Sequence, residues 1–188
     1  MRGIRYLFLA GFLGLVGPAH AAEKALDEAQ ALGAALASNT GEAMVAATMA
    51  ARAQDPVVRA YAMRLLEDHG DAATRLLSYQ EQAGIQAKDS RNLRKDLAAS
   101  TKMTEMLWAK EPGAELDQRF LTDTIAHHRE ELRTLEEVLI PAAQSQQLQA
   151  MLTRQREAVM GHLDQACTLG QRLGAETEPC MVTQPGTR

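Results

Sequence analysis

Apolar residues recur at alternating steps of four and three along several long stretches of the chain, which is the spacing of one face of an α-helix. The clearest stretch is 56–84, with Asp55 placed as a helix N-cap and Gly84 placed to end the helix in a left-handed turn. Its inward positions are Val58, Ala62, Leu65, His69, Ala72, Leu76, Tyr79 and Ala83. A histidine therefore interrupts an otherwise apolar helix face.

The same spacing predicts three other long helices and one shorter segment, which is either a short helix or a helical crossover connection. In chain order they cover about 23–53, 91–110 (the shorter segment), 114–140 and 142–173. Polar residues at 38–41 predict a kink or a new start in the first helix, and Pro141 predicts an interruption or the start of the next segment. Histidine again takes an inward position in the third and fourth long helices, at His128 and His162.

Composition supports an entirely helical protein. Ala, Leu, Glu, Gln, Arg and Met are frequent, whereas β-branched and aromatic residues are scarce and no long stretch alternates with period two. We therefore expect an all-α fold, an up-down bundle of four long helices with an extra helical segment between the second and third. Residues 22–175 form this domain, and 176–188, with two prolines and a glycine, form an irregular tail.

The first 21 residues have the features of a cleavable signal peptide. Arg2 and Arg5 precede an apolar run, and Ala19-His20-Ala21 has the small-x-small form of a signal peptidase site. The run is too short to span a membrane. We therefore predict a periplasmic or secreted protein with no membrane span.

The charge balance argues against a nucleic-acid partner. The formal net charge is −4, and it becomes −6 once Arg2 and Arg5 are removed with the predicted signal peptide. Phosphate binding needs a positive face, and the sequence shows no basic cluster. The two cysteines, Cys167 and Cys180, could form a disulfide between the last helix and the tail in an oxidising compartment, or remain free thiols.

Four histidines follow the predicted cleavage site, and three of them lie at inward positions of different long helices. Residues near the middle of facing helices can meet at one level of a bundle, which is how bundle cores build metal sites. His69, His128 and His162, with Glu42 from the first helix, are the candidate ligands, because imidazole binds transition metals and a carboxylate adds charge compensation. If these histidines are buried together, their pKa values should lie below about 6.5, and stability should fall as the pH drops through that value.

The spacing departs from a di-iron carboxylate site, which uses Glu-x-x-His on two helices. Mostly histidine ligands fit zinc or copper better than a pair of iron ions, although iron remains a candidate metal. Asp123, His127 and Glu131 share another helix face at four-residue spacing, which we interpret as a solvated charge pattern. The methionines lack a Met-x-x-Met cluster and are interpreted as core filling.

Four segments resemble a known family of exported ferritin-like bundle proteins, the domain of unknown function four-one-four-two. They are SNTGEAMVAATMAARA, DPVVRAYAMRLLEDHGDA, LDQRFLTDTIAHHRE and GHLDQACTL, which contain Glu42, Asp68-His69, Asp117 with Phe120 and His128, and His162. The resemblance covers roughly 25–173. It implies a ferritin-like four-helix bundle outside the cytoplasm and inward positions for Glu42 and the three histidines, but no substrate.

These observations leave two hypotheses for the function. One is a protein that binds a transition metal (Zn, Cu or Fe) at the Glu/His cluster, and the alternative is a non-catalytic envelope or stress-related interaction protein whose core histidines are only hydrogen-bonded. Nothing in the sequence indicates a nucleophilic catalyst or a nucleotide-binding loop, so a binding role is favoured over an enzyme.

Overall fold

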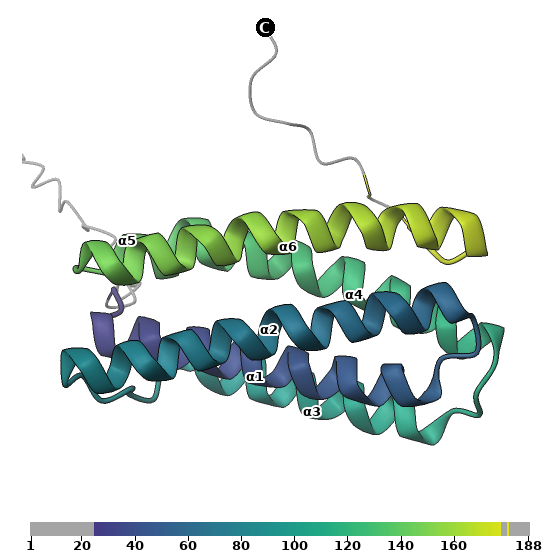
Figure 1. The fold of residues 1–188 in the computed structure, drawn as a ribbon, viewed down its shortest axis with the longest axis horizontal. Helices are drawn as coiled ribbons and strands as arrows, with labels where there is room; N and C mark the ends of the chain where they lie inside the picture. The colour runs from purple at the N-terminus through teal and green to yellow at the C-terminus, as the bar shows by residue number, and fades with distance from the viewer. Residues whose placement is uncertain (1–24, 178–179, 181–188) are drawn as a thin grey trace, which may run out of the picture.

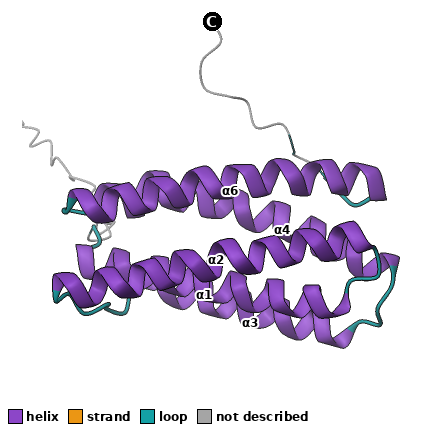
Figure 2. Ribbon diagram, viewed as in Figure 1, coloured by secondary structure: helices purple, strands orange, loops and turns teal. Residues whose placement is uncertain are grey.

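The computed structural model describes residues 25–177 and Cys180, and all regular structure in this part of the chain is helical (Figure 2). The elements are α1 (Glu28–Arg52), α2 (Pro56–Ala83), α3 (Arg91–Ala109), α4 (Ala114–Thr134), η1 (Leu135–Leu139), α5 (Ile140–Ala142) and α6 (Gln146–Leu173). The predicted signal peptide at 1–21 and most of the predicted tail lie outside the described residues.

The long helices lie side by side in two groups (Figure 1). One group has α1 between α2 and α3, and the other is the pair α4 and α6; α2 packs against α6 to join the groups. Each long helix reverses the direction of the one before it, so α3 carries the chain back along the full length between α2 and α4 (Figure 1). As a result α2 and α4 run in the same direction, and the strict up-down order that we expected for the four long helices without α3 is wrong.

Local signals explain where the helices begin and end. Asp55 accepts hydrogen bonds from the backbone N–H groups of Val57 and Val58, with Pro56 at the first helical position. Gly84 ends α2 with φ 63°, a left-handed conformation that glycine adopts without steric cost. The predicted limits of this helix are thus confirmed, because its capping residues are explicit in the sequence.

Helix α1 is continuous, so the predicted interruption at 38–41 is wrong. Two of the polar residues there are buried and bonded inside the protein: the Asn39 side-chain amide donates to the Ala35 carbonyl, and the Ser38 hydroxyl donates to the Glu131 carboxylate. Gly41 stays helical and allows α3 to approach, since a Cβ at this position would collide with the Ser100 side chain.

Replacing Gly41 with alanine should therefore destabilise the protein, although alanine is the better helix former by about 1 kcal/mol. The new methyl group would collide with both side-chain atoms of Ser100. We expect a net loss of about 2 kcal/mol in the free energy of unfolding, measured by urea denaturation. The double variant Gly41→Ala/Ser100→Gly should recover at least half of this loss; no recovery would show that the α1–α3 contact is not the cause.

The interruption predicted at Pro141 lies two residues later in the chain. Leu135–Leu139 forms a π-helical turn, and the wider turn lets the chain pass through Pro141, which has no backbone N–H to donate. The chain becomes extended at Ala143, and α6 begins after Ser145, whose hydroxyl accepts from the Leu148 N–H.

Buried apolar side chains form two clusters, one toward each end of the long helices. The first contains Met49, Tyr61, Leu65, Phe120, Leu121 and Leu163 among others, and the second contains Leu32, Leu76, Leu135, Leu139, Leu148 and Leu152 among others. The positions between these clusters on α1, α2, α4 and α6 are occupied by buried polar residues. The candidate site residues therefore form a polar layer between two apolar cores.

The sulfur atoms of Cys167 and Cys180 lie at disulfide-bond distance, with their Cα atoms 5.7 Å apart. This pair ties the end of α6 to the residue 13 positions further along the chain. Of the two interpretations left open by the sequence, the structure supports the disulfide. None of the helices in the described part of the chain combines the length and the apolar character needed to cross a bilayer.

Candidate metal centre

Three histidines from three helices meet in the polar layer. His69 on α2, His128 on α4 and His162 on α6 are at most 4% exposed, and each places a ring nitrogen within 4.8 Å of the nitrogens offered by the other two. Their ring centroids are 5.1 to 5.7 Å apart. The sequence prediction that these inward histidines come together is confirmed.

Outer partners orient two of the rings. Asn39 donates its amide to the Ala35 carbonyl, so its oxygen is the atom that accepts the Nδ1–H of His69, at 3.1 Å. The Asp68 carboxylate accepts the Nε2–H of His162, at 2.8 Å. These bonds select the tautomers in which His69 Nε2 and His162 Nδ1 carry lone pairs. Both of these nitrogens are buried without a hydrogen-bond partner among the described residues.

His128 is fully buried, and of the three histidines it is the one beside the carboxylates of Glu42 and Glu131. Its Nδ1 is 3.5 Å from Glu131 and 4.0 Å from Glu42, and neither of its ring nitrogens forms a hydrogen bond with the described residues. Four imidazole nitrogens of the cluster thus lack a partner in the interior. A buried polar atom without a partner costs free energy, so this arrangement calls for a ligand that accepts lone pairs.

Glu42 faces the neighbouring histidine instead of joining the cluster. Its Oε1 lies 2.7 Å from His127 Nε2, and its other oxygen is the one 4.0 Å from His128. The group with ligand atoms within 4.8 Å of each other contains the three histidines without Glu42. Glu42 is therefore placed behind His128, where its charge acts on the centre without direct contact.

Glu131 is the second buried carboxylate of this layer. One of its oxygens accepts hydrogen bonds from Ser38 and from the Gln155 amide, both at 2.9 Å. The other is the oxygen 3.5 Å from His128 and has no hydrogen-bond partner among the described residues. Our interpretation of Asp123, His127 and Glu131 as a solvated charge pattern is thus wrong for Glu131, and for His127, which is bound to Glu42.

Burial and neighbouring charges separate the pKa values in this layer. Burial lowers the pKa of His69 to about 4 and holds the pKa of His128 well below its usual range, as expected from the sequence. Burial would lower the pKa of His127, but the Glu42 carboxylate outweighs it and raises this pKa to about 9. His127 in turn holds the pKa of Glu42 below its usual range, although Glu42 is buried. Burial, then the charge of Glu42, raises the pKa of Glu131 to about 7. At neutral pH the layer thus holds one buried ion pair beside uncharged imidazoles at His69 and His128.

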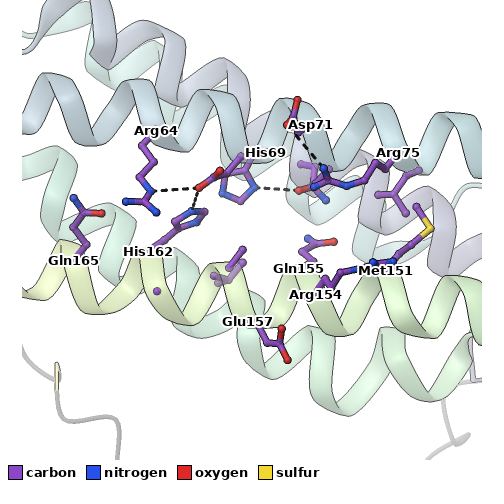
Figure 3. A pocket seen from close by; sticks show the side chains of 17 residues that line it. Arg64, His69, Asp71, Arg75, Met151, Arg154, Gln155, Glu157, His162 and Gln165 are labelled. Atoms are coloured by element: carbon purple, nitrogen blue, oxygen red, sulfur yellow. Dashed lines mark hydrogen bonds and ion pairs between the residues drawn. The ribbon is translucent and has the colours of Figure 1, made fainter.

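A cavity between α2 and α6 leads to the cluster (Figure 3). Its volume is about 410 Å³, and His69 and His162 both line it. The Tyr61 hydroxyl donates to the His162 backbone carbonyl at 3.0 Å, which fixes α6 against α2 beside this cavity. The histidine cluster is therefore buried but lies at the inner end of a hollow on the surface.

Sequence reasoning did not assign roles to the residues that surround the histidines. Asp68 precedes His69 directly, Gln155 lies on the inward face of α6, and Glu131 is three residues from His128, a spacing that places both on one helix face. The three-residue spacing of His128 and Glu131 could have indicated that Glu131 faces inward, but the charged neighbours of Glu131 suggested a solvated face.

The comparisons with known proteins identify a family but no named relative. The family described as Domain of unknown function (DUF4142) matches residues 16–169, well over half of the chain. No curated protein and no solved structure matches this chain. The resemblance based on the four segments around Glu42, His69, His128 and His162 is confirmed, and the chain belongs to the DUF4142 family.

Proposed function

We propose that this protein binds one transition-metal ion through His69, His128 and His162. The observation that carries the proposal is the set of buried, unpartnered ring nitrogens, of which each histidine offers one within 4.8 Å of the others. A hydrogen-bonded core histidine would use both nitrogens, and these residues do not. A metal ion would accept the three lone pairs and remove the cost of leaving them unpaired.

The donor set fits the size and charge of such an ion. A tetrahedral metal with bonds of about 2.1 Å places its ligand nitrogens about 3.4 Å apart, so the three rings need only a small approach. Asn39 and Asp68 supply the outer hydrogen bonds that orient metal-binding histidines. Glu42 and Glu131 add negative charge behind His128. Three imidazoles favour zinc or copper, and iron is the third candidate.

The fold that we propose is a ferritin-like four-helix bundle, made of α1, α2, α4 and α6 with α3 as an added helix on the outside. Only Ser100 and Leu107 of α3 are buried, whereas the other four helices supply every residue of the polar layer described above. We also propose that the protein is exported, by means of the signal peptide at 1–21. The disulfide-bonded pair Cys167 and Cys180 supports this location, because disulfides persist in oxidising compartments.

The test is the melting temperature of tag-free protein with and without added Zn²⁺, Cu²⁺ or Fe²⁺, together with the metal content after dialysis. A ligand that binds only the folded state stabilises it by about 2.7 kcal/mol at a concentration 100 times its dissociation constant. We expect an increase in melting temperature for the parent and none for His69→Gln, His128→Gln or His162→Gln.

His127→Gln is the matched control, because it makes the same substitution next to a proposed ligand but outside the cluster. It should keep the metal-dependent increase even if its own stability is lower. If neither the parent nor this control responds to any of the metals, the proposal fails and an interaction protein with a metal-free core becomes the better interpretation.

A further inference from the structure

The cavity between α2 and α6 is polar and ends on the histidine cluster (Figure 3). His69 and His162 line it and are at most 4% exposed, and both carry an unpartnered ring nitrogen. A metal held by three protein ligands keeps a free coordination position, in contrast to a closed structural site with four. The hollow reaches the cluster on the side of two of its three ligands.

We propose that this cavity admits a small dicarboxylate, which binds the metal through one carboxylate and Arg154 through the other. The inference rests on the metal centre proposed above and adds the ligand of its free position. It assigns the cavity-lining Arg154 as the residue that selects the ligand, and it leaves metal binding itself to the three histidines.

Charge favours an anion at the inner end of the cavity. A divalent metal bound by three neutral imidazoles keeps two positive charges. Of the two buried carboxylates beside His128, Glu131 at 3.5 Å can offset one of these charges, whereas Glu42 is already paired with His127. Asp68 is shared between His162 and Arg64. An entering carboxylate would supply the missing negative charge in a place with little water, where such an interaction is strong.

Charge also favours an anionic group at the outer part of the cavity. Three arginines and three carboxylates line the cavity, and two of the arginines have counter-ions: Arg64 lies 3.7 Å from Asp68, and Arg75 lies 3.9 Å from Asp71. The third carboxylate, Glu157, forms no ion pair with Arg154. Arg154 has no ion pair with any described residue. A guanidinium group binds a carboxylate with two parallel hydrogen bonds, so it suits the second end of such a ligand.

The spacing along α6 sets the length of the ligand. Arg154 and His162 are eight residues apart, about 12 Å along the helix axis, and both side chains reach into one cavity. A single carboxylate such as acetate can occupy only one end. A dicarboxylate of suitable length can occupy both.

The first experiment uses protein loaded with Co²⁺, whose visible spectrum changes when an added ligand coordinates the metal. Acetate and a series of dicarboxylates from malonate to adipate are titrated into the parent, Arg154→Gln and Arg172→Gln. Arg172 is the matched control, since it is an arginine of the same helix that lies outside the cavity and pairs with Asp55. We expect one dicarboxylate to bind the parent about fivefold to tenfold more tightly than acetate does, and we expect Arg154→Gln alone to remove this preference.

The second experiment fills the cavity without disturbing the core. Gly161 lines the cavity, and a Cβ added there meets nothing within 4 Å; the same is true of Gly70, which is not part of the lining. Gly161→Leu should bind Co²⁺ at equilibrium as the parent does but respond at least tenfold more weakly to every carboxylate. Gly70→Leu should behave like the parent in both measurements.

The two proposals can fail separately. If Co²⁺ does not bind, or binds equally well after His69→Gln, the metal centre itself is wrong. If Co²⁺ binds through the histidines but no carboxylate changes its spectrum, the metal centre stands and the open position is wrong. If acetate and all dicarboxylates bind equally and Arg154→Gln has no effect, the assignment of Arg154 and of a dicarboxylate is overturned.

Discussion

Asp117→Ala is expected to lower the free energy of unfolding by about 3 kcal/mol, although the residue is far from the histidine cluster. Asp117 is 2% exposed, and its two carboxylate oxygens accept the backbone N–H groups of Gln54 and Asp55, at 3.1 and 2.7 Å. These residues form the turn between α1 and α2, so the carboxylate joins α4 to that turn. Its removal leaves two backbone donors without their acceptors.

Urea denaturation of Asp117→Ala and of the control Asp123→Ala tests this expectation. Asp123 is on the same helix but pairs only with the exposed Arg119 among the described residues, and such a pair contributes at most about 1 kcal/mol. Asp117→Asn should be intermediate, because its amide keeps one acceptor oxygen. Equal losses for the two alanine variants would mean that Asp117 does not hold the turn.

The pH dependence of stability is expected to differ between the metal-free parent and His128→Gln by about 1.4 kcal/mol per pH unit between pH 6 and 5. The folded pKa of His128 lies below the unfolded value of about 6.5. In this range the unfolded chain therefore binds a proton that the folded chain does not, and His128 makes the parent less stable as the pH falls. His69 acts in the same direction, with a folded pKa of about 4.

Two carboxyl groups oppose this effect in the parent. Burial raises the pKa of Asp96 to about 6, and Glu131 has a pKa of about 7, so between pH 6 and 5 the folded chain holds protons that the unfolded chain has released. The parent should therefore change little in this range, and the simple fall that we expected from the histidines alone is offset. His128→Gln, with one opposing histidine removed, should gain stability as the pH falls.

Urea midpoints of both proteins at half-unit steps from pH 9 to 5 provide the measurement, with His127→Gln as the control. His127 has a raised folded pKa of about 9, so it stabilises the parent below about 6.5 and this stabilisation is lost as the pH rises toward 9. The slope of the control's stability curve should differ from that of the parent mainly between pH 7 and 9. Parallel curves for the parent and His128→Gln between pH 6 and 5 would show that His128 is not a buried neutral imidazole.

The sequence predicted the helices well where their signals are local. Asp55, Pro56 and Gly84 mark the ends of α2, and the step of three and four residues placed His69, His128 and His162 on inward faces, which is where they lie. The direction of α4 was harder to predict, because the sequence left open whether 91–110 forms a helix long enough to return the chain. The observed α3 is long enough.

The residues around the histidines depend on contacts between helices, which helical spacing cannot specify. Glu42 was correctly placed facing inward, but its partner is His127, a residue that spacing alone assigned to a solvated face. Likewise Ser38 and Asn39 look like helix breakers in the sequence, and only the acceptors and donors on α2 and α4 explain why they remain in a continuous helix. Polar residues in a core take their role from partners distant in the chain.

The polar layer also divides the molecule into two regions that can open separately. The Met49 and Phe120 cluster and the Leu32 and Leu148 cluster are separate, so amide hydrogens near the two ends should exchange with solvent through distinct local openings, each requiring less free energy than global unfolding. A ligand that bridges α2, α4 and α6 in the middle would be lost in either opening. Its binding would therefore merge the two exchange events into one cooperative unit.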